Sequence, residues 1–456
     1  MSRSRWGLRV RERDFEPPPR PALYFPTPCN RCENQTCSLF PRTGPEAHSG
    51  FERFAKSLLT EKQQPENANA HVSLMAGRLI ASNPISKEME IELGDLSTIG
   101  PVTFDDTVSG VAEFTAEARI DPQTGEWVNA AARFGPMPEY VIYSVEPTEA
   151  HRQPGGQVAR RLIGRVPTPA GSNVCFMHTY GLTENYAIVF HISLELDMAT
   201  VVKSELCYIA YDEASRPYVS CEVPYTWMPH DRPTMAYLVE RATGKVSELS
   251  LPAFYYSHIV NAFEVESNGN SGGISIVVDL CARDAPPPGW SDASLYRTLD
   301  DWRMVCGQLR RLRLDFGTGE HEISAAEHLR VDSLYVNPSH VGRKHRYSYG
   351  EHVEVQPGGK QTLRLIKVDH DDIDATRLWA EQNLTTEEPS SPMFVPRPES
   401  KDEDDGVVLS YVRDHSSGNT CVVVLDAATL HEAARIYLPP DAFVPHLVHS
   451  VWVPAH

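Results

Sequence analysis

From about residue 70 to its end, the chain alternates short runs of β-forming residues with residues typical of tight turns. Turns that combine an Asp with a Thr-Gly pair lie at 121–126 and 315–320, a Thr-Gly turn lies at 241–245, and related turns follow at 369–376 and 426–430. Asp can cap its own turn and Gly accepts positive φ, so these segments suit hairpins. The expected strands are 74–80, 140–145, 186–194, 274–280, 363–368, 407–412 and 421–425.

Few helical periodicities compete with these strands, so the pattern predicts an all-β fold. Hairpins that recur at irregular multiples of one blade length are typical of a β-propeller with inserted loops, because each blade is a four-stranded meander. A β-sandwich would also produce this pattern.

Composition narrows the functional class. The chain has 456 residues, of which 41% are hydrophobic, enough for a sizeable core. Its net charge of -19 argues against a nucleic-acid surface, since phosphate binding needs a concentrated basic face. The sequence has no run of about 18 apolar residues, so no transmembrane helix is predicted.

Residues 1–50 are expected to form a poorly defined N-terminal arm, either packed on the propeller or partly disordered. Residues 1–21 carry six arginines and no apolar core, which argues against a secretory signal and leaves an organelle transit peptide as an alternative. The nine cysteines have no disulfide framework, so we expect a cytoplasmic protein. Cys29, Cys32 and Cys37, with His48, would form half of a zinc site or a loop of free thiols.

Three histidines lie in strand-forming segments far apart in the sequence. His178 lies in MHTYGLTENY (177–186), His258 in SHIVNAFE (257–264), and His449 in VPHLVH (444–449), where His446 is a rival. A closed all-β fold can bring such side chains to one axis. A buried histidine bonded to a backbone carbonyl is the simpler interpretation of each one alone.

Together these segments resemble the carotenoid cleavage oxygenase family (retinal pigment epithelial membrane protein and lignostilbene dioxygenase type). The resemblance implies a seven-bladed β-propeller with a small helical and loop cap, and a non-haem Fe(II) held by four axial histidines. His178, His258 and His449 match three of them. Where the family has Thr-Ala-His-Pro-Lys followed by Asp-Pro-x-Thr-Gly-Glu, this chain has TAEARIDPQTGE (115–126), so Glu117 replaces the first histidine. Further similar blocks lie at 312–319, 346–350, 392–398, 404–410 and 423–435.

The resemblance also implies three carboxylates that support the iron histidines from behind. Asp332 keeps one of them in a shortened form. The other two positions read as Asn83 and Ser391, and Glu388 would need a backbone shift to replace the carboxylate missing at Ser391.

The expected metal ligands are therefore His178, His258 and His449, with Glu117 as fourth ligand or as a carboxylate facing the cavity. Three imidazoles and a carboxylate suit Fe(II), one ion per chain. Alternatively, Glu117 is buried with a raised pKa and serves as a general acid or base.

Three functions follow from the resemblance. The first is an Fe(II)-dependent dioxygenase that uses O2 to cleave a C=C bond of an apolar conjugated substrate, such as an apocarotenoid or a stilbenoid. The second is a non-oxidative isomerase, hydrolase or cyclase, and the third is a metal-free binder of a hydrophobic ligand.

Peripheral contact with a membrane stays open, although no amphipathic stretch indicates it. Residues 51–456 would form one propeller domain, with 285–289, 291–312 and 399–405 as cap or surface loops.

Overall fold

A computed structural model describes residue 68 and residues 70–453 with gaps. The gaps are 85–86, 106–107, 109–112, 134, 197–207, 212–216, 221–224, 230–231, 268–272, 288–305, 356–360, 440–443 and 445–446. The expected N-terminal arm, the cysteines at 29, 32 and 37, and His446 lie outside the described residues. Regular structure in the described part is almost entirely β, with three short 3-10 turns: η1 (Ala150–Arg152), η3 (Pro338–His340) and η4 (Ile373–Ala375).

Antiparallel meanders make up the first half of the described chain. One sheet holds β1 (His71–Met75), β2 (Arg78–Ser82), β3 (Met89–Ile91) and β4 (Thr98–Pro101). The next holds β5 (Glu113–Phe114), β6 (Arg119–Ile120), β7 (Trp127–Arg133), β8 (Glu139–Val145) and β9 (Arg161–Pro167). A third holds β10 (Gly181–Leu182), β11 (Tyr186–His191), β16 (Thr234–Glu240) and β17 (Val246–Leu251). Two strand pairs are inserted here, β12 (Leu194–Leu196) with β15 (Tyr225–Trp227) and β13 (Tyr208–Tyr211) with β14 (Pro217–Ser220).

The second half contains two larger sheets. The first comprises β18 (Tyr255–Glu266), β19 (Ile274–Arg283), β20 (Gly307–Asp315), β21 (His321–Val336), β22 (Tyr347–Val355), β23 (Gln361–Asp369) and β24 (Arg377–Leu378). The second comprises β25 (Glu387–Pro389), β26 (Met393–Pro396), β27 (Gly406–Asp414), β28 (Thr420–Asp426) and β29 (Glu432–Tyr437). The long β21 pairs first with β20 and then, from Val331 onward, with β22, so it links two four-stranded units.

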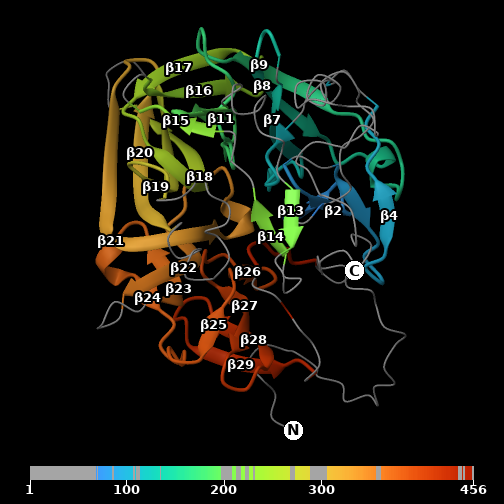
Figure 1. The fold of residues 1–456 in the computed structure, drawn as a ribbon, viewed down its shortest axis with the longest axis vertical. Coiled ribbons are helices and arrows are strands. Elements are labelled where there is room, and N and C mark those ends of the chain that lie inside the picture. Colours follow the sequence, from blue (N-terminus) through green and yellow to red (C-terminus); the bar gives the residue numbers. More distant parts are fainter. Residues whose placement is uncertain are drawn as a thin grey trace.

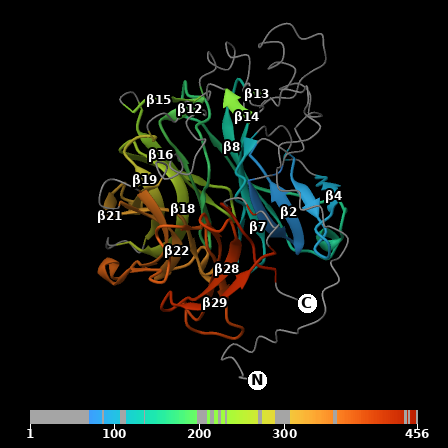
Figure 2. The same cartoon turned by 60° about the horizontal axis from the view of Figure 1, so that its bottom comes forward.

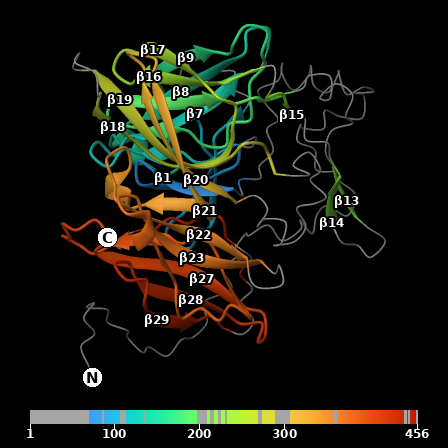
Figure 3. The same cartoon turned by 90° about the vertical axis from the view of Figure 1, so that its left-hand side faces the viewer.

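The sheets follow one another around the molecule. Figure 1 shows this circuit from blue β2 through green β16 and orange β21 to red β28, and Figure 2 shows it from another side. In Figure 3 the β13–β14 hairpin stands away from this ring. The all-β prediction is confirmed, and the ring places segments distant in sequence around a common centre.

The core lies between neighbouring sheets. Its main cluster joins β7, β8, β11, β16, β18 and β19 and includes the fully buried Tyr140, Ile188 and Phe190. A second cluster, with Trp127 and Tyr143 at its centre, packs the first two sheets together. Burial of large apolar and aromatic side chains at sheet interfaces is the main favourable contribution to such a fold.

The predicted Asp and Thr-Gly turns do connect strands. At 121–126, Asp121 Oδ1 accepts from Gln123 N at 2.9 Å and Gly125 has a φ of 71°.

Two other expectations were wrong in detail. Residues 74–80 form a hairpin because Ala76 and Gly77 both adopt positive φ between β1 and β2. The predicted loop at 291–312 ends in strand β20, whose alternation of buried and partly exposed residues suits a sheet.

No helix among the described residues is long and apolar enough to cross a membrane.

Candidate functional site

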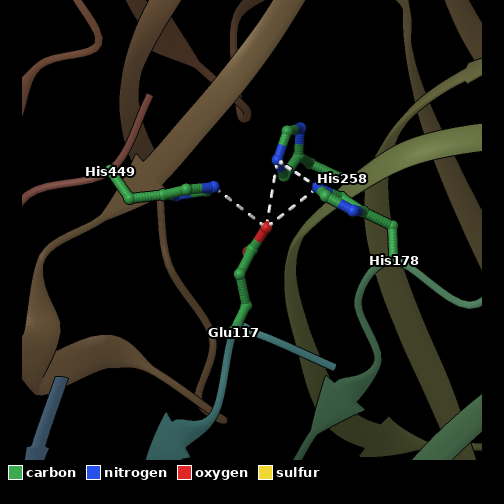
Figure 4. A group of neighbouring side chains, drawn as sticks. All are labelled: Glu117, His178, His258 and His449. Atoms are coloured by element: carbon green, nitrogen blue, oxygen red, sulfur yellow. Dashed lines mark hydrogen bonds and ion pairs between the residues drawn. The ribbon is translucent and has the colours of Figure 1, made fainter. Parts of the chain in front are cut away.

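Four side chains from distant parts of the chain converge at the centre of the ring (Figure 4). Glu117 lies between β5 and β6, His178 precedes β10, His258 lies in β18, and His449 lies in the segment after β29. Their potential ligand atoms all lie within 4.8 Å of one another. The structure thus brings together the four residues that the sequence singled out.

The Oε1 atom of Glu117 is the point on which the three rings converge. It lies 3.2 Å from Nε2 of His178, 3.1 Å from Nε2 of His258 and 3.3 Å from Nε2 of His449. The Nε2 atoms of His178 and His258 are themselves 3.2 Å apart. Oε1 is buried and has no hydrogen bond of acceptable geometry among the described residues, although three ring nitrogens surround it.

These separations fit the donor set of one metal ion. Metal–nitrogen bonds are about 2.1 Å long, so neighbouring donors lie about 3.0 Å apart at right angles and about 3.4 Å apart at tetrahedral angles. Four of the six donor pairs, at 3.1 to 3.3 Å, fall within that range, and the two pairs between His449 and the other imidazoles lie within 4.8 Å. Three imidazoles with one carboxylate are suitable ligands for a divalent transition metal.

Irregularities in two strands orient His258 and its partner. Register shifts interrupt the β18–β19 pairing around His258 and the β21–β22 pairing after Asp332. Ser333 adopts a φ of 48°, and its N–H donates to Asp332 Oδ1 at 2.8 Å. Bulges of this kind redirect side chains next to functional sites. As a result Asp332 Oδ1 lies 2.6 Å from His258 Nδ1.

Glu117 is fixed by its neighbours in the chain. The hydroxyl of Ser82 donates to the carbonyl of Ala116 at 2.8 Å. The guanidinium of Arg119 donates to the backbone oxygens of Ile259 and Val260, which directly follow His258. The loop that carries Glu117 is therefore tied both to β2 and to the strand that carries His258.

The segment of His178 is attached to the same strand. Tyr256 Oη donates to the Thr179 carbonyl at 2.8 Å, and Thr179 Oγ1 accepts from Ile259 N at 2.9 Å. The ring of Phe176 stacks on His178 with centroids 6.0 Å apart, and Tyr225 packs edge-on against Phe176. His178 is also the most accessible of the four, with 30% of its side chain exposed. This side of the site is therefore aromatic and partly open.

Other residues of the segments 177–186 and 257–264 hold these two segments in place. Glu264 accepts from Thr183 Oγ1 at 2.7 Å, from Asn185 N at 2.8 Å and from Asn185 Nδ2 at 3.0 Å. Asn261 Nδ2 donates to the carbonyls of His340 and Arg343, each at 2.9 Å. These bonds join the two motifs to each other and to the loop after η3.

Charge in the site is arranged around the carboxylate. Burial alone would raise the pKa of Glu117, but the nearby imidazoles of His449, His258 and His178 hold it well below its usual value. Burial lowers the pKa of His258, yet Glu117 and Asp332 outweigh it and raise that pKa well above the usual value. Burial holds the pKa of His449 well below its usual value. The raised pKa expected for Glu117 as an acid or base is thus wrong in direction, because the surrounding imidazoles stabilise its charge.

Around the site, the structure reveals contacts that the sequence did not indicate. Tyr335 Oη lies 2.7 Å from His449 Nδ1, so a hydroxyl contacts the outer nitrogen of this ring. Ser391 Oγ instead donates to Glu351 Oε1 at 2.9 Å, and burial raises the pKa of Glu351 to about 8. Glu388 pairs with His415 at 2.7 Å, and Asn83 directly follows β2.

A further histidine lies beside the site. The His71 ring meets that of His449 edge-on with centroids 4.8 Å apart, and its Nδ1 is buried with no hydrogen-bond partner among the described residues. Burial lowers the pKa of His71 to about 4. Sequence reasoning missed Tyr335, Glu351 and His71 because their contacts with the site residues join distant parts of the chain.

A second group of potential ligands comprises Asp279, His345 and His370, all buried. Arg311 donates to both oxygens of Asp279, at 2.7 and 2.9 Å. The guanidinium already neutralises this carboxylate, so we interpret the group as a structural network behind β18 and β19.

Known proteins resemble this chain in sequence over most of its length. The family model described as "Retinal pigment epithelial membrane protein" matches residues 27–454. The carotenoid cleavage dioxygenase 8 homolog A, chloroplastic, of Oryza sativa subsp. japonica is 28% identical over 435 residues, which are 90% of this chain and 70% of the relative. A carotenoid cleavage oxygenase of Mycobacterium tuberculosis is 26% identical over 423 residues, covering 85% of this chain and 77% of the relative.

Solved structures show the same fold. A cobalt-substituted Synechocystis ACO superposes with a TM-score of 0.68 at 22% identity, covering 92% of this chain and 79% of that chain. An ACO/RPE65 chimera gives 0.66 at 21% identity, with 90% and 83% covered. These neighbours are seven-bladed propellers, and the predicted fold class is confirmed. With its match over nearly the whole length, the chain belongs to the carotenoid cleavage oxygenase (RPE65) family.

Proposed function

We propose that this protein is an Fe(II)-dependent dioxygenase that cleaves a C=C bond of an apolar conjugated substrate. The observation that carries the proposal is the convergence of three imidazole nitrogens and one carboxylate oxygen within 4.8 Å of one another. Relatives named as carotenoid cleavage dioxygenases support the reaction class, and a cobalt-substituted structural neighbour supports a metal centre.

Glu117, His178, His258 and His449 would hold the ion through Oε1 and the three Nε2 atoms. Bound Fe(II) would supply the activation of dioxygen beside the alkene. The chain itself keeps the ligands oriented: Asp332 holds Nδ1 of His258 and Tyr335 contacts Nδ1 of His449, which directs both Nε2 atoms inward. Such outer contacts fix the orientation of metal-binding imidazoles.

The substrate would approach from the side of His178. This ring is the most exposed of the three, and Phe176 and Tyr225 form an aromatic surface beside it. An apolar conjugated chain or ring system gains contact energy on such a surface. The three Nε2 atoms, by contrast, converge on Glu117 Oε1, where they would hold the ion.

The test combines metal analysis with product analysis. Protein purified without chelators should contain close to one iron per chain, and incubation with an apocarotenoid or a stilbene under 18O2 should yield two carbonyl products carrying the label. Turnover without oxygen would instead indicate a non-oxidative isomerase, hydrolase or cyclase. Tight binding of the apolar probe with neither iron nor turnover would indicate a metal-free binding protein.

A further inference from the structure

The hydroxyl of Tyr335 lies between two partners on the C-terminal segment. Its oxygen is 2.7 Å from Nδ1 of His449 and 3.1 Å from the carbonyl oxygen of Val448. A tyrosine hydroxyl can donate one hydrogen bond and accept another. The carbonyl can only accept, whereas Nδ1 of a neutral imidazole donates or accepts according to its tautomer.

The Tyr335 hydroxyl can therefore satisfy Nδ1 of either tautomer of His449. When Nδ1 of His449 carries the proton, it donates to the Tyr335 oxygen, the hydroxyl donates to Val448, and the Nε2 lone pair is free for a metal ion. When Nε2 carries the proton, it faces Glu117 Oε1 at 3.3 Å and Tyr335 donates to Nδ1. The same hydroxyl satisfies the ring in both cases by rotating about its C–O bond.

His258 has no such choice. Its Nδ1 lies 2.6 Å from Oδ1 of Asp332, and this oxygen also accepts from Ser257 Oγ at 3.0 Å and from Ser333 N at 2.8 Å. An ionised carboxylate only accepts, so Nδ1 of His258 stays protonated. The two imidazoles differ because one has an anionic acceptor behind it and the other a neutral hydroxyl.

We propose that Tyr335 is a positioning residue that allows His449 to change tautomer when a metal ion enters the site. Nε2 loses its proton to water and Nδ1 gains one from water, so the charge of the ring is unchanged, and the Tyr335 hydroxyl turns from Nδ1 to the Val448 carbonyl. Nδ1 of His258 is protonated with or without the ion, while the proton on His449 moves from Nε2 to Nδ1 on binding. This inference rests on the metal centre of the proposed function.

The experiment uses full-length protein with 15N-labelled histidine, prepared without metal and then titrated with Zn(II) as a diamagnetic probe. NMR distinguishes protonated from unprotonated ring nitrogens. In the wild type we expect His449 to carry its proton on Nε2 before zinc is added and on Nδ1 afterwards, whereas Nδ1 of His258 stays protonated throughout. Because this measurement uses the wild type, it does not depend on the folding of any variant.

Tyr335→Phe supplies the second readout. It removes the acceptor for Nδ1–H, and we expect zinc affinity to fall about 10-fold, the lower end of the effect of losing an outer partner of a ligand. Tyr349→Phe is the matched control, since Tyr349 is also buried but donates to the Ala427 carbonyl at 3.0 Å, and its affinity should equal that of the wild type.

The outcomes separate the two hypotheses. A wild type that binds no zinc contradicts the metal centre and, with it, the tautomer exchange. A wild type that binds zinc while His449 keeps one tautomer, or a Tyr335→Phe variant with unchanged affinity, overturns the role of Tyr335 and leaves the metal centre standing.

Discussion

The carboxylate of Asp332 lies 2.6 Å from Nδ1 of His258 and so directs the opposite nitrogen, Nε2, at Glu117 Oε1, 3.1 Å away. Two strands carry this relationship, β21 and β18, and each departs from regular pairing at the residue involved. The contact links a buried negative charge outside the cluster to a ring inside it. Glu117 and Asp332 together would balance the charge of a divalent ion.

Asp332→Asn should lower iron affinity about 10–100-fold, because an amide is a weaker partner for Nδ1–H than a carboxylate. Titration of metal-free protein with Fe(II) under anaerobic conditions measures the change. Ser257→Ala is the control: it removes one 3.0 Å hydrogen bond to Asp332 but leaves the charge in place, so its effect should be smaller. Equal affinities for Asp332→Asn and the wild type would contradict the role of Asp332.

Glu117→Gln should sharply reduce the iron retained through purification. The amide keeps the size of the side chain but removes the anionic oxygen on which three Nε2 atoms converge. Glu117→His should retain iron, because a fourth imidazole is also a suitable ligand. Glu88→Gln provides a matched control, since Glu88 is likewise buried but lies outside the four-residue cluster. Full iron content in Glu117→Gln would show that Glu117 is not a ligand.

Glu351→Gln should stabilise the protein near neutral pH. Burial raises the pKa of Glu351 to about 8, whereas the unfolded chain ionises near its ordinary value of 4.5. The folded state therefore holds a proton that the unfolded state loses, and wild-type stability declines as pH rises from the unfolded pKa through the folded one. The gain on substitution is up to about 3 kcal/mol at pH 7.

Urea unfolding of both proteins between about pH 5 and pH 8 checks this prediction. Gln keeps an acceptor for the Ser391 hydroxyl, so the packing is maintained. The difference between the variant and the wild type should grow with pH. A difference independent of pH would mean that Glu351 is not protonated in the folded protein.

Gly350→Ala should destabilise the fold by about 1–3 kcal/mol, the usual cost of overpacking. An added Cβ would lie 2.6 Å from Leu334 Cδ2, 2.8 Å from Ser333 O and 2.9 Å from Asp332 O. Since these atoms belong to the bulge that carries Asp332, iron affinity should fall as well. Gly317→Ala, in an exposed turn, is the control. Thermal melting and metal titration of both variants measure the two effects.

The sequence by itself determined the all-β class, the Asp and Thr-Gly hairpins, and the four central residues. Local turn chemistry and strand propensity act over a few residues, so they can be read along the chain. Thr183, Asn185 and Glu264 belong to segments that the sequence singled out, and the structure joins these segments by hydrogen bonds.

Only the tertiary structure decided which side chains contact the central residues and their neighbours from outside the cluster. Tyr335 reaches His449 across 114 positions of sequence, and Glu351 reaches Ser391 across 40. Such contacts depend on the order of the sheets and on bulges such as the one at Ser333, which local propensity does not specify. The alternative of a raised pKa for Glu117 fails for the same reason: burial raises that pKa, and the direction reverses only because three imidazoles from other parts of the chain surround the carboxylate.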